Sequence, residues 1–142
     1  MQVTFAGARF DISEEWCDIT EDLDPGVPPT LARPDGVGVI QFSVAKYKGG
    51  AKPSVTRADL TEMLSAFLKT KRLTGIEPAV LEGSRCTAVG GVSKTPDEII
   101  GAWYLSNGND VALVTYTCTA DDPACEAELA EAGKVVRTLE FV

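Results

Sequence analysis

Apolar and polar residues alternate along several segments of the chain, and this pattern predicts β-strands. In the strand predicted over residues 37–47, Ile40, Phe42 and Val44 share one face, and Gln41, Ser43 and Ala45 share the other. Further strands are predicted near residues 2–5, 8–12, 84–94, 98–106 and 110–119, with a short one in residues 139–142. The strand over 110–119 is apolar on both faces, with Val111, Leu113 and Val114, and is therefore expected in the middle of a sheet.

A helical period replaces this alternation in residues 56–73. The apolar residues there are spaced i, i+3, i+4, i+7 and i+8, as on the buried stripe of an amphipathic helix, and they are Leu60, Met63, Leu64, Phe67 and Leu68. Thr56 and Asp59 have the spacing of a capping box at the start, and Gly75 is the predicted stop.

A second helix is predicted to open at Asp121-Asp122-Pro123, with an aspartate cap and proline at the first helical position. Its expected buried stripe is Cys125, Leu129, Ala132 and Val136.

A tight hairpin is predicted between the strands over 98–106 and 110–119. Asn107-Gly108 supplies the two positive φ angles of a two-residue type I′ turn. Trp103 and Leu105 are then expected on one face of the sheet and Tyr104 on the other.

Strands dominate this order of elements, and the two helices must cover what the sheet leaves exposed. The fold class predicted is α+β, an antiparallel sheet flanked by two main helices. The 142 residues fit a single domain, residues 1–142.

Three segments resemble PsbP-like proteins. FDISEEW at 10–16 resembles a strand leading into a turn that ends in tryptophan, although Glu15 stands where those proteins have glycine. WYLSNG at 103–108 with VALVTY at 111–116 resembles their central hairpin, and RTLEF at 137–141 resembles their closing helix and strand. The resemblance implies a PsbP-like α/β/α sandwich.

The PsbP-like group includes the extrinsic subunit of the oxygen-evolving photosystem, Ran-binding nuclear import factors and many small bacterial proteins. Some of those bacterial proteins look like chaperones or immunity partners of secreted toxins. The resemblance therefore implies a non-enzymatic scaffold that binds other proteins, with no cofactor and no catalytic residues to carry over.

Composition and charge narrow the function classes. The hydrophobic fraction is 44% and the charged fraction 24%, as in an ordinary globular protein, and no apolar run is long enough to cross a membrane. A net charge of −8 disfavours nucleic acid as a ligand, and the absence of histidine removes the commonest general base and metal ligand. No signal peptide is visible in residues 1–10, so a cytoplasmic location is expected, which leaves a mature periplasmic form open.

Charge is distributed unevenly along the chain. Every charged residue in 11–24 is an acid, whereas bases predominate in 46–72. Complementary charge steers the association of proteins, so a basic protein partner is predicted for the acidic segment. The predicted partner-binding residues are Trp16, Asp18, Glu21, Asp22 and Asp24. Two alternatives stay open, that Trp16 packs in the core and that the acids serve only solubility.

The four cysteines lack the spacing of a zinc site, and no metal is expected. Cys118 ends a strand and Cys125 starts the next helix, so they form the candidate disulfide, with two buried free thiols as the alternative. Cys17 and Cys86 are predicted to be free.

The leading hypothesis is a non-catalytic protein-binding module, most sharply a bacterial immunity or chaperone-like partner of a secreted toxin. The first alternative is a small-ligand or lipid carrier, which a large apolar cavity between sheet and helix would indicate. The second is a hydrolase that uses carboxylates, which two carboxylates converging in one pocket would indicate.

Overall fold

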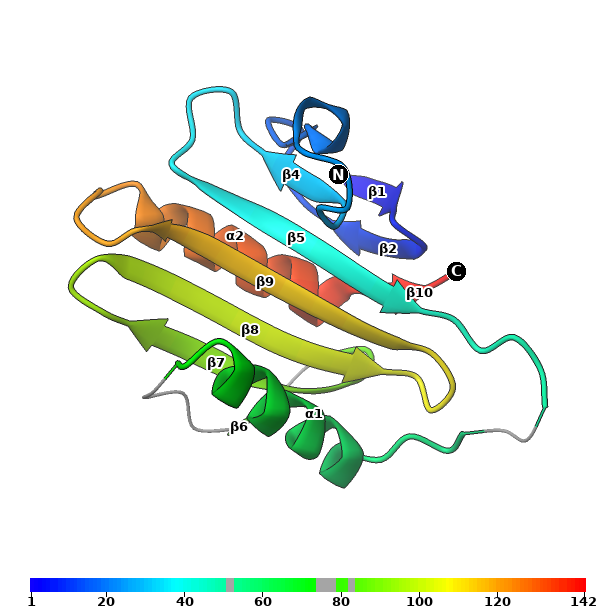
Figure 1. Ribbon diagram of the computed structural model, residues 1–142. Coiled ribbons are helices and arrows are strands. Elements are labelled where there is room, and N and C mark those ends of the chain that lie inside the picture. Colours follow the sequence, from blue (N-terminus) through cyan, green and yellow to red (C-terminus); the bar gives the residue numbers. More distant parts are fainter. Residues whose placement is uncertain (51–52, 74–78, 82–83) are drawn as a thin grey trace.

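The computed structural model describes residues 1–50, 53–73, 79–81 and 84–142 (Figure 1). The helices are α1 (Arg57–Thr70) and α2 (Cys125–Thr138), with a short 3₁₀ turn at Thr20–Asp22. The strands are β1 (Gln2–Phe5), β2 (Ala8–Asp11), β3 (Cys17–Asp18), β4 (Thr30–Ala32), β5 (Gly38–Ala45), β6 (Ala79–Val80), β7 (Thr87–Lys94), β8 (Glu98–Ser106), β9 (Val111–Thr119) and β10 (Glu140–Phe141).

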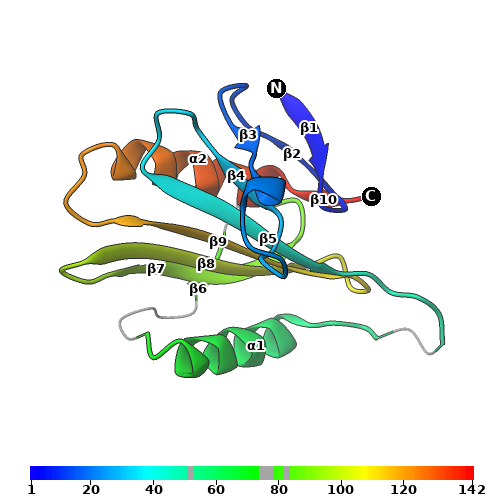
Figure 2. The same cartoon turned by 45° about the horizontal axis from the view of Figure 1, so that its top comes forward.

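Two antiparallel sheets organise the fold. The larger has the strand order β3-β4-β5-β9-β8-β7-β6, and the smaller has the order β1-β2-β10. The strand β9 lies between β5 and β8, which confirms the prediction of a central strand. Helices α1 and α2 lie on opposite faces of the large sheet, and the small sheet lies on the α2 side (Figure 2). The α+β class and the α/β/α sandwich are confirmed.

The main core lies between the large sheet, α2 and the small sheet. Phe42 of β5 stacks on Phe10 of β2 at 5.1 Å between ring centroids, and Phe5 of β1 meets the same ring edge-on at 5.4 Å. A smaller cluster lies under α1 and contains Leu60, Leu64, Val89 and Ala102.

Helix α1 begins as predicted. The Asp59 amide donates to Thr56 Oγ1 at 3.2 Å and the Thr56 amide donates to Asp59 Oδ2 at 2.8 Å, which is the expected capping box. Leu60 and Leu64 are buried, but Met63 is 36% exposed, so its place in the buried stripe was wrong. The predicted stop at Gly75 lies outside the described residues.

Helix α2 begins two residues later than predicted, at Cys125 after Ala124, and no side chain caps it. Asp122 instead stabilises a turn, where its Oδ1 accepts from the Ala124 amide at 2.9 Å. Of the predicted stripe, Leu129 is only half-buried, whereas Glu128 is 2% exposed.

The hairpin between β8 and β9 is present, with Trp103 and Leu105 in the main core and Tyr104 against the α1 cluster, as predicted. The two-residue type I′ turn is wrong, because Ser106 pairs with Val111 and leaves a four-residue loop in which Gly108 alone has a positive φ, at 100°. Asn107 shapes this loop through its side chain, since its Oδ1 accepts from the amides of Asn109 and Asp110 at 3.0 and 2.8 Å.

Candidate functional site

The described residues leave half of the sheet face on the α1 side open. Helix α1 packs on β7 and β8 and leaves the neighbouring strands β9 and β5 uncovered on this side (Figures 1 and 2). Because side chains alternate along a strand, the odd-numbered residues of β5 and β9 face this open half, while the even-numbered residues of β9 and Ile40 and Phe42 of β5 are buried. The register brings Gln41 opposite Thr115 and Val39 opposite Thr117.

A groove of about 540 Å³ occupies this open half-face. One wall is formed by Phe67 of α1 and by Lys71 and Leu73, which follow the helix, and Pro28 lies on the opposite side. The floor is made by outward-facing residues of three adjacent strands, namely Gln41, Ser43, Glu98, Ile100, Leu113, Thr115 and Thr117.

The floor of the groove carries polar groups that are free to bind. The Gln41 amide nitrogen donates to Thr30 Oγ1 at 3.2 Å. In contrast, the hydroxyls of Ser43, Thr115 and Thr117 form no hydrogen bond with any described residue. These hydroxyls each offer a donor and an acceptor to a ligand.

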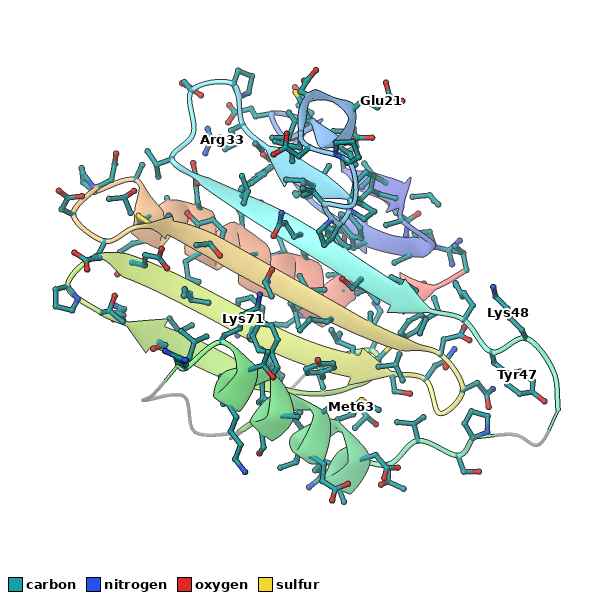
Figure 3. All side chains as sticks on the ribbon, in the orientation of Figure 1. Glu21, Arg33, Tyr47, Lys48, Met63 and Lys71 are labelled. Atoms are coloured by element: carbon teal, nitrogen blue, oxygen red, sulfur yellow. A yellow bond between two sulfur atoms is a disulfide. The ribbon has the colours of Figure 1, made fainter. Side chains whose placement is uncertain are left out.

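Two opposite charges line the same groove without pairing. Lys71 extends from the end of α1 over the sheet (Figure 3), and Glu98 begins β8. Both side chains are exposed, and within the described part of the chain neither forms an ion pair. A ligand that carries both signs of charge would find a partner for each.

The segment 18–24, which carries the acidic residues predicted from the sequence, begins in β3, and β3 and β4 lie beyond β5, on the opposite side of the open half-face from α1 (Figure 1). Asp18, Glu21, Asp22 and Asp24 are all exposed, and we call these four residues the acidic surface. None of the four forms an ion pair with a described base, whereas Glu15 pairs with Arg33. The hydrogen bonds that Thr20 donates lower the pKa of Asp18, so this carboxylate stays charged to lower pH than usual.

A chain of hydrogen bonds joins the acidic surface to the groove. Thr20 donates its hydroxyl to Asp18 Oδ1 at 2.6 Å and accepts the Thr30 amide at 2.8 Å. The Thr30 hydroxyl in turn accepts the Gln41 side chain. The acidic surface and the groove floor are therefore held in one connected structure.

Trp16 does not belong to this surface. Its side chain is 7% exposed and packs in the main core, which corrects the interpretation of Trp16 as an aromatic anchor for a partner. The preceding strand β2 has Phe10 and Ala8 turned toward the core, and the turn over 13–16 carries the indole to the same side. Trp16 is thus the structural residue of the turn, which was the alternative for it.

The structure joins Cys118 and Cys125 by a disulfide, with 6.3 Å between their Cα atoms. The bridge fastens the end of β9 to the first residue of α2, and both residues are buried. Cys17 and Cys86 are free, as predicted. Burial raises the pKa of the Cys86 thiol, and the nearby Glu140 carboxylate raises it further, which disfavours the reactive thiolate.

Sequence reasoning missed the buried carboxylate of Glu128. It accepts the amides of Val37 and Gly38 at 3.0 and 2.9 Å, and the Tyr116 hydroxyl donates to it at 2.9 Å. The only sequence signal was an acid near the apolar stripe of α2. Its partners are distant in the sequence, so this bonding was not predictable; it fastens α2 to the start of β5.

A second groove, of about 430 Å³, lies between α2 and β7–β8 and is lined by Trp103, Leu129, Gly133, Glu126 and Arg137 among others. Among the described lining residues, each of the two grooves contains one carboxylate, Glu98 in the first and Glu126 in the second.

Within the described ranges, no group of three or more potential metal-ligating side chains comes together. No helix in the same ranges is long and apolar enough to span a membrane.

The fold is that of known PsbP-like structures. The Ran-binding protein Mog1p of Saccharomyces cerevisiae matches with a TM-score of 0.61 and 11% identity, over 100% of this chain and 95% of that one. The cyanobacterial PsbP (CyanoP) of Synechocystis sp. PCC 6803 matches with a TM-score of 0.57 and 11% identity, over 100% and 92%. These likenesses concern the fold.

A larger protein of Bacteroides thetaiotaomicron matches with a TM-score of 0.65 and 15% identity. The match covers 96% of this chain and 46% of that protein, so the chain spans about half of its length. No protein-family model and no curated protein matches the sequence.

Proposed function

We propose that this protein is a non-catalytic binding module that holds a basic protein partner on the acidic surface. The observation that carries the proposal is that Asp18, Glu21, Asp22 and Asp24 are exposed together and have no ion-pair partner among the described residues. Unpaired charges of one sign create a field that attracts an opposite surface and accelerates encounter. The similarity to Mog1p, a Ran-binding protein, supports a protein as the partner.

A more specific proposal is that the basic partner is a secreted toxin and that this protein is its immunity or chaperone-like protein. A toxin that cleaves nucleic acid must present a basic surface to hold phosphates, and an acidic surface is complementary to it. Binding of a purified toxin encoded beside this protein's gene tests the narrower form.

The test of the general proposal compares two variants with the same change in net charge. The first is Asp18→Asn/Glu21→Gln/Asp22→Asn/Asp24→Asn. The control is Asp35→Asn/Glu62→Gln/Asp97→Asn/Asp121→Asn, which neutralises exposed acids elsewhere. A partner captured by the wild type is purified, and its association rate is measured by stopped-flow fluorescence across a series of salt concentrations.

Neutralising the acidic surface should slow association by about tenfold or more at low salt and flatten its salt dependence. The control should retain the wild-type rate and slope, apart from the small effect of net charge. Equal rates for the two variants would mean that the acidic surface is not the interface, and the basic stretch 46–72 would be the next candidate.

A second candidate function is the carriage of a small ligand, which the groove favours. Its volume of about 540 Å³ lies in the range of about 300–1,000 Å³ found for small-molecule sites. The polar floor fits a polar ligand better than a lipid chain. The hydrolase alternative is less well supported, because it needs two convergent carboxylates and Glu98 is the only carboxylate that the described residues bring to the groove.

The bridge between Cys118 and Cys125 favours an oxidising compartment over the cytoplasmic location expected from the sequence, because disulfides are rare in reducing compartments. Mass measurement after alkylation of the protein from its native source tests this point. Two labelled thiols would support an oxidising compartment and four a reducing one.

A further inference from the structure

We propose that the groove beside α1 takes an extended segment of the protein partner, in which an apolar side chain is flanked by a basic residue and a carboxylate. This inference rests on the proposed function, since it specifies how the same partner engages the protein. It adds a second contact area to the acidic surface, on the same side of the molecule as α1.

The apolar part of the groove fits a side chain of the partner. Phe67 and Leu73 form the wall, while Ile100 and Leu113 lie on the floor. The Phe67 ring is held by an edge-to-face contact with Tyr104 at 6.5 Å, so this wall is already in place before a ligand arrives. Pre-formed apolar pockets of this kind receive the anchoring side chains of protein partners.

The spacing of the polar floor matches a polypeptide. Thr115 and Thr117 are alternate residues of β9, so their side chains are about 7 Å apart along the strand. Alternate residues of an extended segment have the same repeat, and the backbone amides and carbonyls of such a segment can bond the free hydroxyls of Ser43, Thr115 and Thr117.

Charge complementarity defines the ends of the segment. Glu98 can pair with a cation and Lys71 with an anion, because both side chains are exposed and neither is paired within the described residues. A segment with a basic residue near Glu98 and a carboxylate near Lys71 satisfies both. The remaining bases of the partner would lie over the acidic surface, across the open half-face from α1 (Figure 1).

The experiment uses a phage-displayed library of random twelve-residue peptides, selected on the wild-type protein. Selected peptides are then synthesised and titrated by calorimetry against three variants. Thr115→Arg fills the groove with a large side chain, and Thr87→Arg makes the same change at an exposed strand position outside it. Lys71→Glu reverses one charge at an exposed position, where it should leave the fold intact.

Selected peptides should bind the Thr115→Arg variant at least about tenfold more weakly than the wild type. They should bind the Thr87→Arg variant as they bind the wild type. Selection on Lys71→Glu should replace the carboxylate of the peptides by a base. A library that yields no peptide, or peptides that bind Thr115→Arg as well as the wild type, would overturn the proposal.

Two other occupants would also overturn it. A wild type that is dimeric by light scattering, with a monomeric Thr115→Arg variant, would assign the groove to a second copy of this chain. A small molecule retained by the wild type in native mass spectrometry and lost from Thr115→Arg would assign the groove to that molecule.

The captured protein partner distinguishes this inference from the proposed function. If that partner loses affinity for the acidic-surface variant but not for Thr115→Arg, the proposed function holds and this inference fails. If neither change weakens that partner, the proposed function fails as well.

Discussion

The two faces of the large sheet differ in how completely they are covered. Helices α1 and α2 are both 14 residues long and lie on opposite faces (Figure 2). On the α2 side, the small sheet β1-β2-β10 adds a second cover, and the two together bury Ile40 and Phe42 of β5 and the even-numbered residues of β9. On the α1 side the helix is the only cover that the described residues supply, and the odd-numbered residues of the same strands remain half-open.

The two faces of β5 and β9 differ in polarity, and the polar residues on the open half-face are suited to contact with water or a ligand. Phe42 and Val114 are 0% exposed and apolar, while their neighbours Ser43 and Thr115 are polar. The open face is mixed, because it carries Val111 and Leu113 as well as the polar residues Gln41, Ser43, Thr115 and Thr117, whereas the covered face of the same strands is almost wholly apolar. The difference between the faces therefore separates the part of the molecule that stabilises the fold from the part available for binding.

The largest effect is expected from removing the central ring of the main core. Phe42→Ala should lower the free energy of unfolding by about 3–5 kcal/mol, because a cavity opens between Phe5 and Phe10. Ser43→Ala, the next residue on the opposite face, should change it by less than about 0.5 kcal/mol. Urea denaturation checks both variants, and similar losses for the two would contradict the contrast between the faces.

Reduction of the disulfide should have the next largest effect. The bridge between Cys118 and Cys125 closes a short loop, and its loss should cost about 2.5 kcal/mol through the greater freedom of the unfolded chain. Urea denaturation of the wild type with and without reductant measures this cost. A Cys118→Ala/Cys125→Ala variant is the control and should not respond to reductant; a wild type that does not respond would show that the bridge contributes nothing to stability.

Much of the fold was predictable because its signals are local. The alternation in residues 37–47 and 110–119, the stripe from Leu60 to Leu68 and the Thr56 capping box each depend on neighbours in the sequence. The strands β3 and β4 were not predicted, since they have two and three residues and are too short to show a period. The turn after Ser106 was misjudged because the Asn107 side chain, rather than its φ angle, shapes the loop.

The candidate site was predictable only in part. The exposure of Asp18 and its acidic neighbours follows from a run of charge, which is a local property. The groove is assembled from α1, β5, β8 and β9, so its residues come together only through the sheet register. One signal was present in the sequence, because the polar face of residues 37–47 carries Gln41 and Ser43, and both line the groove.

A smaller effect is expected at Tyr116, on the buried side of β9. Tyr116→Phe removes the hydrogen bond to Glu128 and should cost about 1 kcal/mol near pH 7. Burial raises the pKa of Tyr116 above its ordinary value of 10.0, and the bond to Glu128 raises it further. The unfolded chain therefore loses this proton first, so the contribution of Tyr116 is complete below pH 10 and is lost as the pH rises above it.

Urea denaturation of both proteins between pH 7 and 11 checks this expectation. The difference in stability between wild type and Tyr116→Phe should be constant below pH 10 and should shrink above it. Tyr104, whose pKa burial also raises, is present in both proteins and does not affect the difference. A difference that stays constant to pH 11 would show that Tyr116 titrates normally in the folded protein.

The smallest effect is expected on the open half-face itself, where the same substitution can be compared at two threonines. Thr115→Val removes a hydroxyl that has no hydrogen bond among the described residues, and it should change the free energy of unfolding by less than about 0.5 kcal/mol.

Thr30 is the comparison for Thr115. It is fully buried beside the groove, donates to the Pro28 carbonyl at 2.7 Å and accepts from Gln41. Thr30→Val should therefore cost about 1–3 kcal/mol, because it leaves the part-buried Pro28 carbonyl and the Gln41 amide without their partner. Urea denaturation of the wild type and of the two variants measures both changes in the free energy of unfolding. A loss at Thr115 as large as that at Thr30 would mean that the floor of the groove stabilises the fold, and the hydroxyls would then not be free to bind a partner.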